Sequence, residues 1–148
     1  MRLENKVAVV TGAAGGIGAE IVRCFVAEGA RVIAADLDQS AADKLARPYD
    51  GKVVGVAVDV TCYTDVEAMM TAAIEHFGSL DVVVNNAGIA VPKMLLDHDP
   101  ATDFELTTAV NQKGVYHGIL AAARALQSLG KPGVILNTSS VYGLSLIH

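Results

Sequence analysis

The chain has 148 residues, enough for one domain with a sizeable hydrophobic core. Hydrophobic residues make up 52% of it but aromatic residues only 5%, so the core must consist mainly of aliphatic side chains, as in parallel sheets covered by helices. The net charge of -5 and the lack of a Lys/Arg run argue against nucleic acid as a partner, and no apolar stretch reaches the roughly 18 residues that suggest a membrane span.

The two cysteines, Cys24 and Cys62, have no spacing typical of a metal site, which favours reduced thiols in a cytoplasmic protein. Cys24 falls on the apolar side of a predicted helix and is expected in the core, whereas Cys62, near a turn, is expected at the surface. The amino terminus runs directly into an apolar strand, without the features of a signal peptide. We therefore expect a single cytoplasmic domain over 1–148, with no metal.

Short apolar runs alternate with helical patterns along the chain, the order typical of repeated βαβ units. Strands are predicted at 6–10, 31–36, 52–59, 81–86 and 133–140, the last including its exit, and helices at 15–29, 39–46, 63–78 and 101–130. The expected helix boundaries are a cap at Thr64 and ends at Gly29, Pro48 and Gly78. Right-handed crossovers place the first two helices on one face and the next two on the other, which predicts an α/β, Rossmann-like, doubly wound parallel sheet of order 3-2-1-4-5.

A glycine-rich turn, TGAAGGIG, follows the first strand, with Thr11 and Gly12 before Gly16, Ile17 and Gly18. Glycines let the backbone approach a diphosphate closely, and the amino end of the following helix attracts its charge. The strand order reverses beside this turn, where ligands of such sheets bind. The spacing is TGxxxGxG and not the usual GxGxxG, so a loop with spare glycines is the alternative when the motif is taken alone.

Asp36 ends the second strand, where a carboxylate could accept hydrogen bonds from both hydroxyls of an adenosine ribose and would repel a 2′-phosphate. Neither Leu37 nor Gly15 offers a cation for that phosphate, so NAD is favoured over NADP. Asp36 could instead start the turn or cap the next helix, although Asp38 or Ser40 could also form that cap.

The third and fourth strands also end in polar residues. Asp59 and Val60 follow the third strand and could line the adenine edge of such a ligand, although an aspartate leaving a strand is also an ordinary turn residue. The fourth strand ends in NNAG, on the far side of the reversal from the glycine turn. Together with TGxxxGxG, Asp36 and the strand order, this motif makes the chain resemble the short-chain dehydrogenase/reductase family from Lys6 to about Gly143.

The resemblance implies roles for individual residues. Those it assigns to the cofactor are Thr11, Gly12, Gly16, Ile17, Gly18, Asp36, Asp59, Val60, Asn86, Ala87 and Gly88. Among them, Asp59 and Val60 would contact the adenine, and residues 86–88 would lie under the ribose and the nicotinamide. Asn85 would stabilise the sheet.

Two further residues match catalytic positions of the family. Asn111, in the long helix, matches the asparagine that holds a water in a proton relay, and Ser140, in NTSS, matches the active-site serine. From the residues alone, the alternatives are a solvent-facing helix residue for Asn111 and an ordinary turn for the serine pair. In the family the serine orients the substrate, a tyrosine is the general acid/base, and a lysine lowers the pKa of that tyrosine. Their YxxxK motif does not occur in this sequence.

We therefore interpret the chain as the cofactor-binding part of an NAD-dependent oxidoreductase, which when complete acts on a secondary alcohol or a ketone and forms a homo-oligomer. The chain alone is expected to be inactive. The alternative is a non-catalytic NAD-binding sensor or regulatory module, and a purely structural interaction domain ranks last. The substrate would be set mainly by the loop 89–100, in which His98 is expected to lie at the surface.

In complete members of the family, two more strands and further helices extend the sheet. Without them, the strand at 133–140 is expected to be an apolar edge, with Val83, Val134 and Leu136 exposed. Residues 144–148 fit the family pattern poorly, so we do not expect them to be the native continuation.

Overall fold

The computed structural model describes residues 1–140, and the expectation for 144–148 lies outside them. Within this range five strands form one parallel sheet: β1 (Val7–Thr11), β2 (Arg31–Asp36), β3 (Val53–Ala57), β4 (Val82–Asn85) and β5 (Val134–Asn137). They lie in the order β3-β2-β1-β4-β5. The predicted Rossmann-like topology, with its reversal between β1 and β4, is confirmed.

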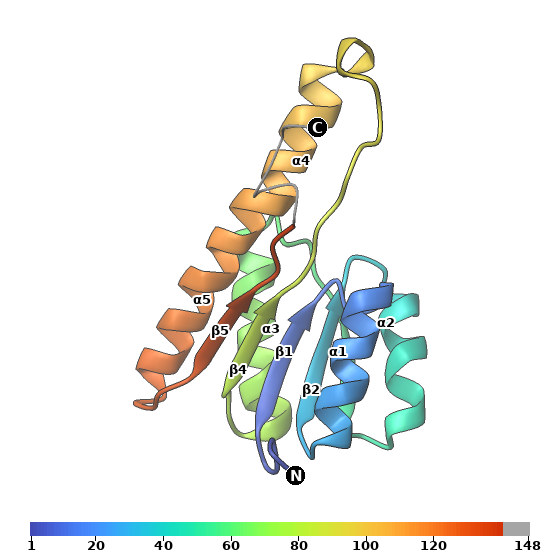
Figure 1. The fold of residues 1–148 in the computed structure, drawn as a ribbon. Helices are drawn as coiled ribbons and strands as arrows, with labels where there is room; N and C mark the ends of the chain where they lie inside the picture. The colour runs from blue at the N-terminus through green and yellow to red at the C-terminus, as the bar shows by residue number, and fades with distance from the viewer. Residues whose placement is uncertain (141–148) are drawn as a thin grey trace.

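Helices cover both faces of the sheet (Figure 1). They are α1 (Gly16–Ala27), α2 (Gln39–Ala46), α3 (Tyr63–Phe77), α4 (Glu105–Thr108) and α5 (Val115–Ser128), with short 3-10 turns at Arg47–Tyr49 and Leu95–Asp97. Side chains of β1 alternate between two cores: Val7 and Val9 pack with residues of α3 and α5, while Ala8 and Val10 pack with residues of α1 and α2. The predicted division of the helices between the faces is confirmed.

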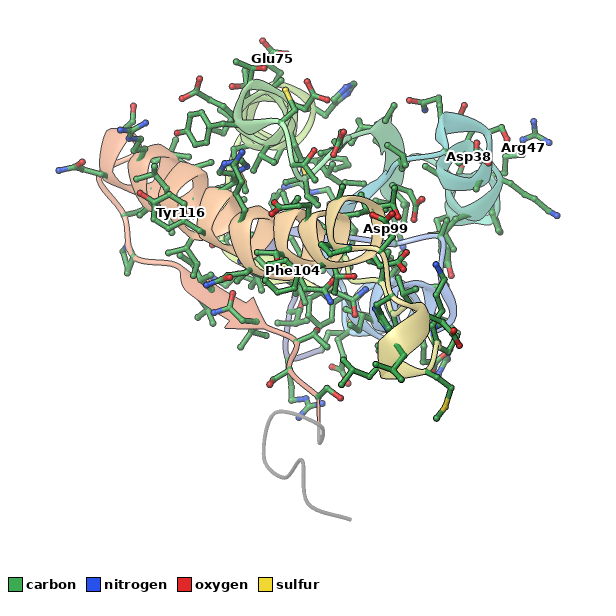
Figure 2. All side chains as sticks on the ribbon, turned by 90° about the horizontal axis from the view of Figure 1, so that it is seen from above. Asp38, Arg47, Glu75, Asp99, Phe104 and Tyr116 are labelled. Atoms are coloured by element: carbon green, nitrogen blue, oxygen red, sulfur yellow. The ribbon has the colours of Figure 1, made fainter. Side chains whose placement is uncertain are left out.

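The helix predicted at 101–130 is one long rod with two π-helical turns, Pro100–Phe104 before α4 and Ala109–Gly114 before α5. Asp99 caps its start by accepting hydrogen bonds from the amides of Ala101 and Thr102. The rod runs past the carboxyl edge of the sheet, and Figure 2 shows Asp99, Phe104 and Tyr116 along it. Among the described residues, none of the helices has the length and apolar character needed to cross a membrane.

Two predictions about helix residues are wrong. Cys24 is exposed, because α1 buries the face that carries Gly18 and Val22 and Cys24 points away from it. Thr64 is not the cap of α3: the helix begins at Tyr63, with Cys62 at the cap position, so Thr64 lies inside its first turn. Gly78 ends α3 in a left-handed conformation, as predicted.

Of the three residues expected to be exposed around the edge strand β5, two are exposed. Val134 and Leu136 are 51% and 47% exposed, as predicted, whereas Val83 is fully buried, contrary to the prediction. In the parallel register Val134 and Leu136 pair with Val82 and Val84, which face α1. Val83 instead pairs with Ile135 on the face that α3 and α5 cover. Neighbouring residues of a strand face opposite sides of the sheet, so the side chain of Val83 lies on the opposite face from those of Val134 and Leu136.

Candidate functional site

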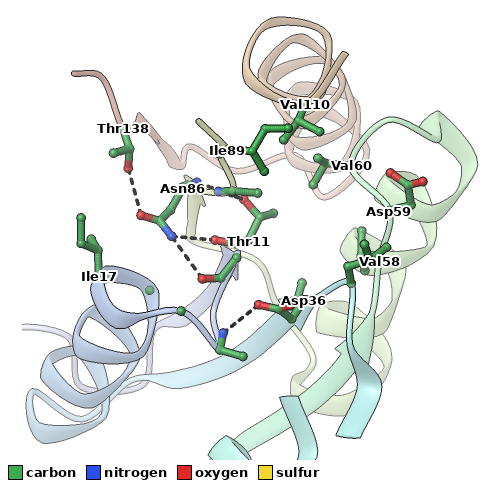
Figure 3. A pocket seen from close by; sticks show the side chains of 18 of the residues that line it. Thr11, Ile17, Asp36, Val58, Asp59, Val60, Asn86, Ile89, Val110 and Thr138 are labelled. Carbon is green, nitrogen blue, oxygen red and sulfur yellow. Dashed lines mark hydrogen bonds between the residues drawn. The ribbon is translucent and has the colours of Figure 1, made fainter. Parts of the chain in front are cut away.

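A cavity of about 760 Å³ lies at the carboxyl edge of the sheet, where the strand order reverses (Figure 3). This volume is within the range of small-molecule sites. All the residues assigned to a cofactor from the sequence line it, from Thr11 to Gly88. The lining residues that the sequence analysis did not assign are Ala14, Gly15, Ala35, Leu37, Val58, Ile89, Val110 and Thr138.

The glycines of the turn after β1 have different environments. A Cβ on Gly18 would collide with the carbonyl group of Gly12 and would lie 2.8 Å from the Cα of Ala13. A Cβ on Gly16 would meet no described residue within 4 Å. Packing within the chain therefore explains Gly18, whereas Gly16, which lines the cavity, has open space beside it.

The amino end of α1 is open toward this cavity. Among the described residues no side chain caps it, and its first turn has no acidic residue. The amides of a first helical turn have no partner within the helix and carry partial positive charge. By contrast, the Asp38 carboxylate caps α2 by accepting from the amides of Ser40 and Ala41, and the bonds from Ser40 hold the pKa of Asp38 below its usual value. The first turn of α1 is thus suited to an anion.

The carboxylate of Asp36 holds the glycine turn against the end of β2. Its Oδ2 accepts from the amide of Ala14 at 2.9 Å, and its Oδ1 accepts from the amide of Asp38 at 3.4 Å. Asp36 therefore does start the local turn, but Asp38 forms the cap of α2. Each carboxylate oxygen has a second lone pair, so Asp36 can still accept from a ligand in the cavity.

Thr11 and Asn86 join the two sides of the strand reversal (Figure 3). The buried hydroxyl of Thr11 accepts from the amides of Asn86 and Ala87, both at 3.0 Å. In return the Asn86 amide group donates to the carbonyls of Thr11 and Gly12, at 3.0 and 3.3 Å. These bonds fix the loop after β4 beside the glycine turn. Next to them, Thr138 donates to Oδ1 of Asn86 at 3.4 Å.

The exit of β3 is held from two other elements. Oδ1 of Asp59 accepts from both the amide and the hydroxyl of Thr61, at 2.8 and 2.7 Å, and the Asp59 amide donates to Asp65 in α3. The Val60 carbonyl accepts from Nδ1 of His117, a buried residue of α5, at 2.9 Å. His117 was not singled out from the sequence, because only the packing of α5 brings it beside β3.

The two residues assigned to catalysis are not among those that line the cavity. Asn111 lies in the π-helical turn before α5, and its side-chain amide pairs with the backbone of Ile89: Oδ1 accepts from the amide and Nδ2 donates to the carbonyl, both at 2.8 Å. Asn111 thereby fixes the loop after β4 to the long helix. Ser140, the last described residue, is exposed.

The loop 89–100 is tied to the long helix by charge. Nζ of Lys93 lies 2.7 Å from Oδ2 of the buried Asp103, which also accepts from the amide of Asp99. The Lys93 ammonium holds the pKa of Asp103 below its usual value. His98 is exposed, as predicted, and its Nε2 bonds the Lys93 carbonyl. Among the described residues, no group of three or more His, Cys, Asp or Glu side chains could hold a metal ion.

Known proteins resemble this chain in sequence and in structure. The family model described as short chain dehydrogenase matches residues 6–147. The chain is 40% identical to 3beta-hydroxysteroid dehydrogenase 2 of Eggerthella lenta, over 96% of this chain and 56% of that protein. It is also 40% identical to meso-2,3-butanediol dehydrogenase of Serratia marcescens, over 97% and 57%.

Among solved structures, it resembles a short chain dehydrogenase/reductase from Burkholderia phymatum in complex with NAD. The TM-score is 0.91 at 31% identity, over 99% of this chain and 53% of that one. The chain thus spans about half the length of these relatives.

Proposed function

Because the chain belongs to the short-chain dehydrogenase family, we propose that its cavity binds NAD, and that the complete protein transfers hydride between NAD and a secondary alcohol or a ketone. One observation carries this proposal. At the strand reversal, the amino end of α1 has no side-chain cap, and the space beside Gly16 in its first turn is open. When bound, the nicotinamide ring supplies the hydride chemistry, which no side chain provides.

The residues around the cavity fit the parts of such a cofactor. The amides of Gly16, Ile17 and Gly18 would face the diphosphate, and the Asp36 carboxylate would accept from the adenosine ribose. The adenine would lie against the β3 exit at Asp59 and Val60. The remaining assigned residues, which would border the nicotinamide end or support it, are Thr11, Gly12, Asn86, Ala87 and Gly88.

The preference for NAD over NADP rests on charge. Asp36 places a carboxylate in the cavity wall, and the neighbouring lining residue Leu37 is apolar and 75% exposed. A 2′-phosphate would meet negative charge there, and the lining residues include no Lys or Arg to offset it. Discrimination against NADP is therefore part of the proposal.

We expect Asp36→Asn to weaken the binding of NAD by about tenfold or more, because the lost charge removes a charge-assisted hydrogen bond to the ribose. The same change should reduce the ratio of the affinity for NAD to the affinity for NADP. Calorimetric titration of both dinucleotides measures this. The matched control is Asp38→Asn, which keeps a good helix cap and should leave both affinities unchanged. Absence of NAD binding by the unaltered chain would remove the proposed function.

Ser140 and Asn111 are proposed to serve catalysis in the complete protein, Ser140 by orienting the substrate oxygen and Asn111 by ordering a water of the proton relay. The sequence has no YxxxK motif to supply the general acid/base, whose contribution is typically about 10²–10⁴-fold. We therefore expect no NADH formation by the 148-residue chain with a panel of secondary alcohols, measured by absorbance. Turnover that Ser140→Ala abolishes would contradict this expectation.

A further inference from the structure

The strand β3 lies at one edge of the sheet, next to β2 alone among the described strands. Its register with β2 turns alternate backbone groups outward, among them the carbonyl of Gly55 and the amide of Ala57. Outward groups of an edge strand would pair with a further strand if one were present. Here a side chain of α2 pairs with them instead.

The side-chain amide of Gln39 bonds both groups. Its Oε1 accepts from the amide of Ala57 at 2.7 Å, and its Nε2 donates to the carbonyl of Gly55 at 3.2 Å. In a parallel sheet, a residue of the neighbouring strand bonds in the same way to two residues that flank its partner. The primary amide of Gln39 thus takes the place of the backbone N–H and C=O of one residue of a further strand.

The orientation of this amide is fixed by its partners. Nε2 also donates to Oδ1 of Asp43, one turn further along α2, at 2.7 Å. A carboxylate and a carbonyl can only accept, and the Ala57 amide can only donate, so the nitrogen of Gln39 must face Asp43 and Gly55.

Gly55 allows α2 to lie close enough for these bonds. A Cβ at position 55 would lie 2.6 Å from the carbonyl carbon of Ala42 and 2.8 Å from its oxygen. Since those atoms belong to the backbone of α2, any side chain would push the helix away from the strand. The glycine in the strand and the glutamine on the helix therefore belong to one contact.

We propose that Gln39 is a positioning residue for the adenosine end of the cavity, a role that rests on the proposed binding of NAD. Gln39 begins α2, just after the short loop that follows Asp36 at the end of β2, and Ala57 directly precedes the lining residues Val58 and Asp59. The amide bridge therefore joins the ribose side of the cavity to the adenine side. Gln39 itself does not line the cavity and acts through these neighbours.

The test compares Gln39→Met, which keeps the length but removes both bonds, with Gln127→Met. Gln127 is an exposed residue of α5 for which no side-chain hydrogen bond is found among the described residues. Hydrogen exchange of the Ala57 amide, followed by NMR, should speed up about tenfold in Gln39→Met and stay unchanged in Gln127→Met. NMR titration should show about tenfold weaker binding of AMP to Gln39→Met, with the weak binding of nicotinamide mononucleotide unchanged.

Each outcome separates the two proposals. If the unaltered chain binds neither NAD nor AMP, the proposed function fails and the positioning role fails with it. If the unaltered chain binds both, unchanged Ala57 exchange or unchanged AMP affinity in Gln39→Met overturns the role of Gln39 alone. Should Gln39→Met not fold, Gln39→Glu keeps the acceptor for Ala57 but not the donor to Gly55, and must weaken AMP binding without affecting nicotinamide mononucleotide.

Discussion

Gly18→Ala is expected to destabilise the chain by about 3 kcal/mol, whereas Gly16→Ala is expected to leave its stability unchanged and weaken its binding of NAD at least about tenfold. The two glycines lie two residues apart in the first turn of α1. At Gly18 the new methyl group would overlap the Gly12 carbonyl, and neither backbone segment can move without disturbing the β1–α1 packing. At Gly16 it would enter open space in the cavity wall.

Urea denaturation gives the two stabilities, and titration with NAD gives the affinities. The pair separates the packing of the glycine turn from its binding role, because each substitution adds the same methyl group. If Gly16→Ala bound NAD as tightly as the unaltered chain, the diphosphate could not lie against the first turn of α1. If Gly18→Ala kept full stability, the close approach to Gly12 would not be a constraint on the fold.

The sequence was sufficient for the sheet order because the strongest signals agree. Short aliphatic runs of four to six residues are too short for helices and favour strands, and the helical segments between them force parallel crossovers. The site followed from the same logic: residues at the carboxyl ends of β1, β2, β3 and β4 must converge, and they do line one cavity. Their individual bonds, such as those of Thr11 to Asn86 and Ala87, required the structure.

The sequence did not show which face of a helix or strand each side chain occupies, or which groups it bonds in the fold. Cys24 lies next to apolar residues in a helical pattern, but a shift of about 100° per residue decides whether it is buried. Val83 was misplaced for the same reason in a strand of four residues. The π-helical turn that contains Asn111 has no pattern of residues that identifies it in the sequence. Gln39 appears as an ordinary polar residue of α2 until its distance to β3 is known.

The end of the sheet opposite the cavity is held by a buried carboxylate. Asp81 directly precedes β4, and its side chain is only 9% exposed. One oxygen accepts from the ammonium groups of Lys131 and Lys6, at 2.8 and 3.3 Å, and the other from the amide of Val7 at 3.0 Å. The backbone of Asp81 also bonds Val7 in β1 and Val134 in β5. Three strands therefore begin around this one residue.

Burial alone would raise the pKa of Asp81, but the hydrogen bonds from Lys131, the Val7 amide and Lys6 outweigh it and lower the pKa to about 2. An aspartate in the unfolded chain titrates near a pKa of about 3.9. Since the folded chain holds the charged form more strongly, this group adds about 2 kcal/mol to stability above pH ~4. That contribution is lost as the pH falls from about 4 toward 2.

Asp81→Asn is accordingly expected to lower the free energy of unfolding at pH 7 by about 2–3 kcal/mol, because it leaves two lysines beside a neutral amide. Its stability should also fall less steeply than that of the unaltered chain between pH 4 and 2, as measured by urea denaturation at several pH values. Of the two lysines, Lys131→Met should have the larger effect, since Lys131 is closer to Asp81 and less exposed than Lys6. Because this cluster lies at the far end of the sheet from the cavity, NAD affinity should be nearly unchanged. If the free energy of unfolding of Asp81→Asn fell as steeply between pH 4 and 2 as that of the unaltered chain, a different group would control the loss of stability.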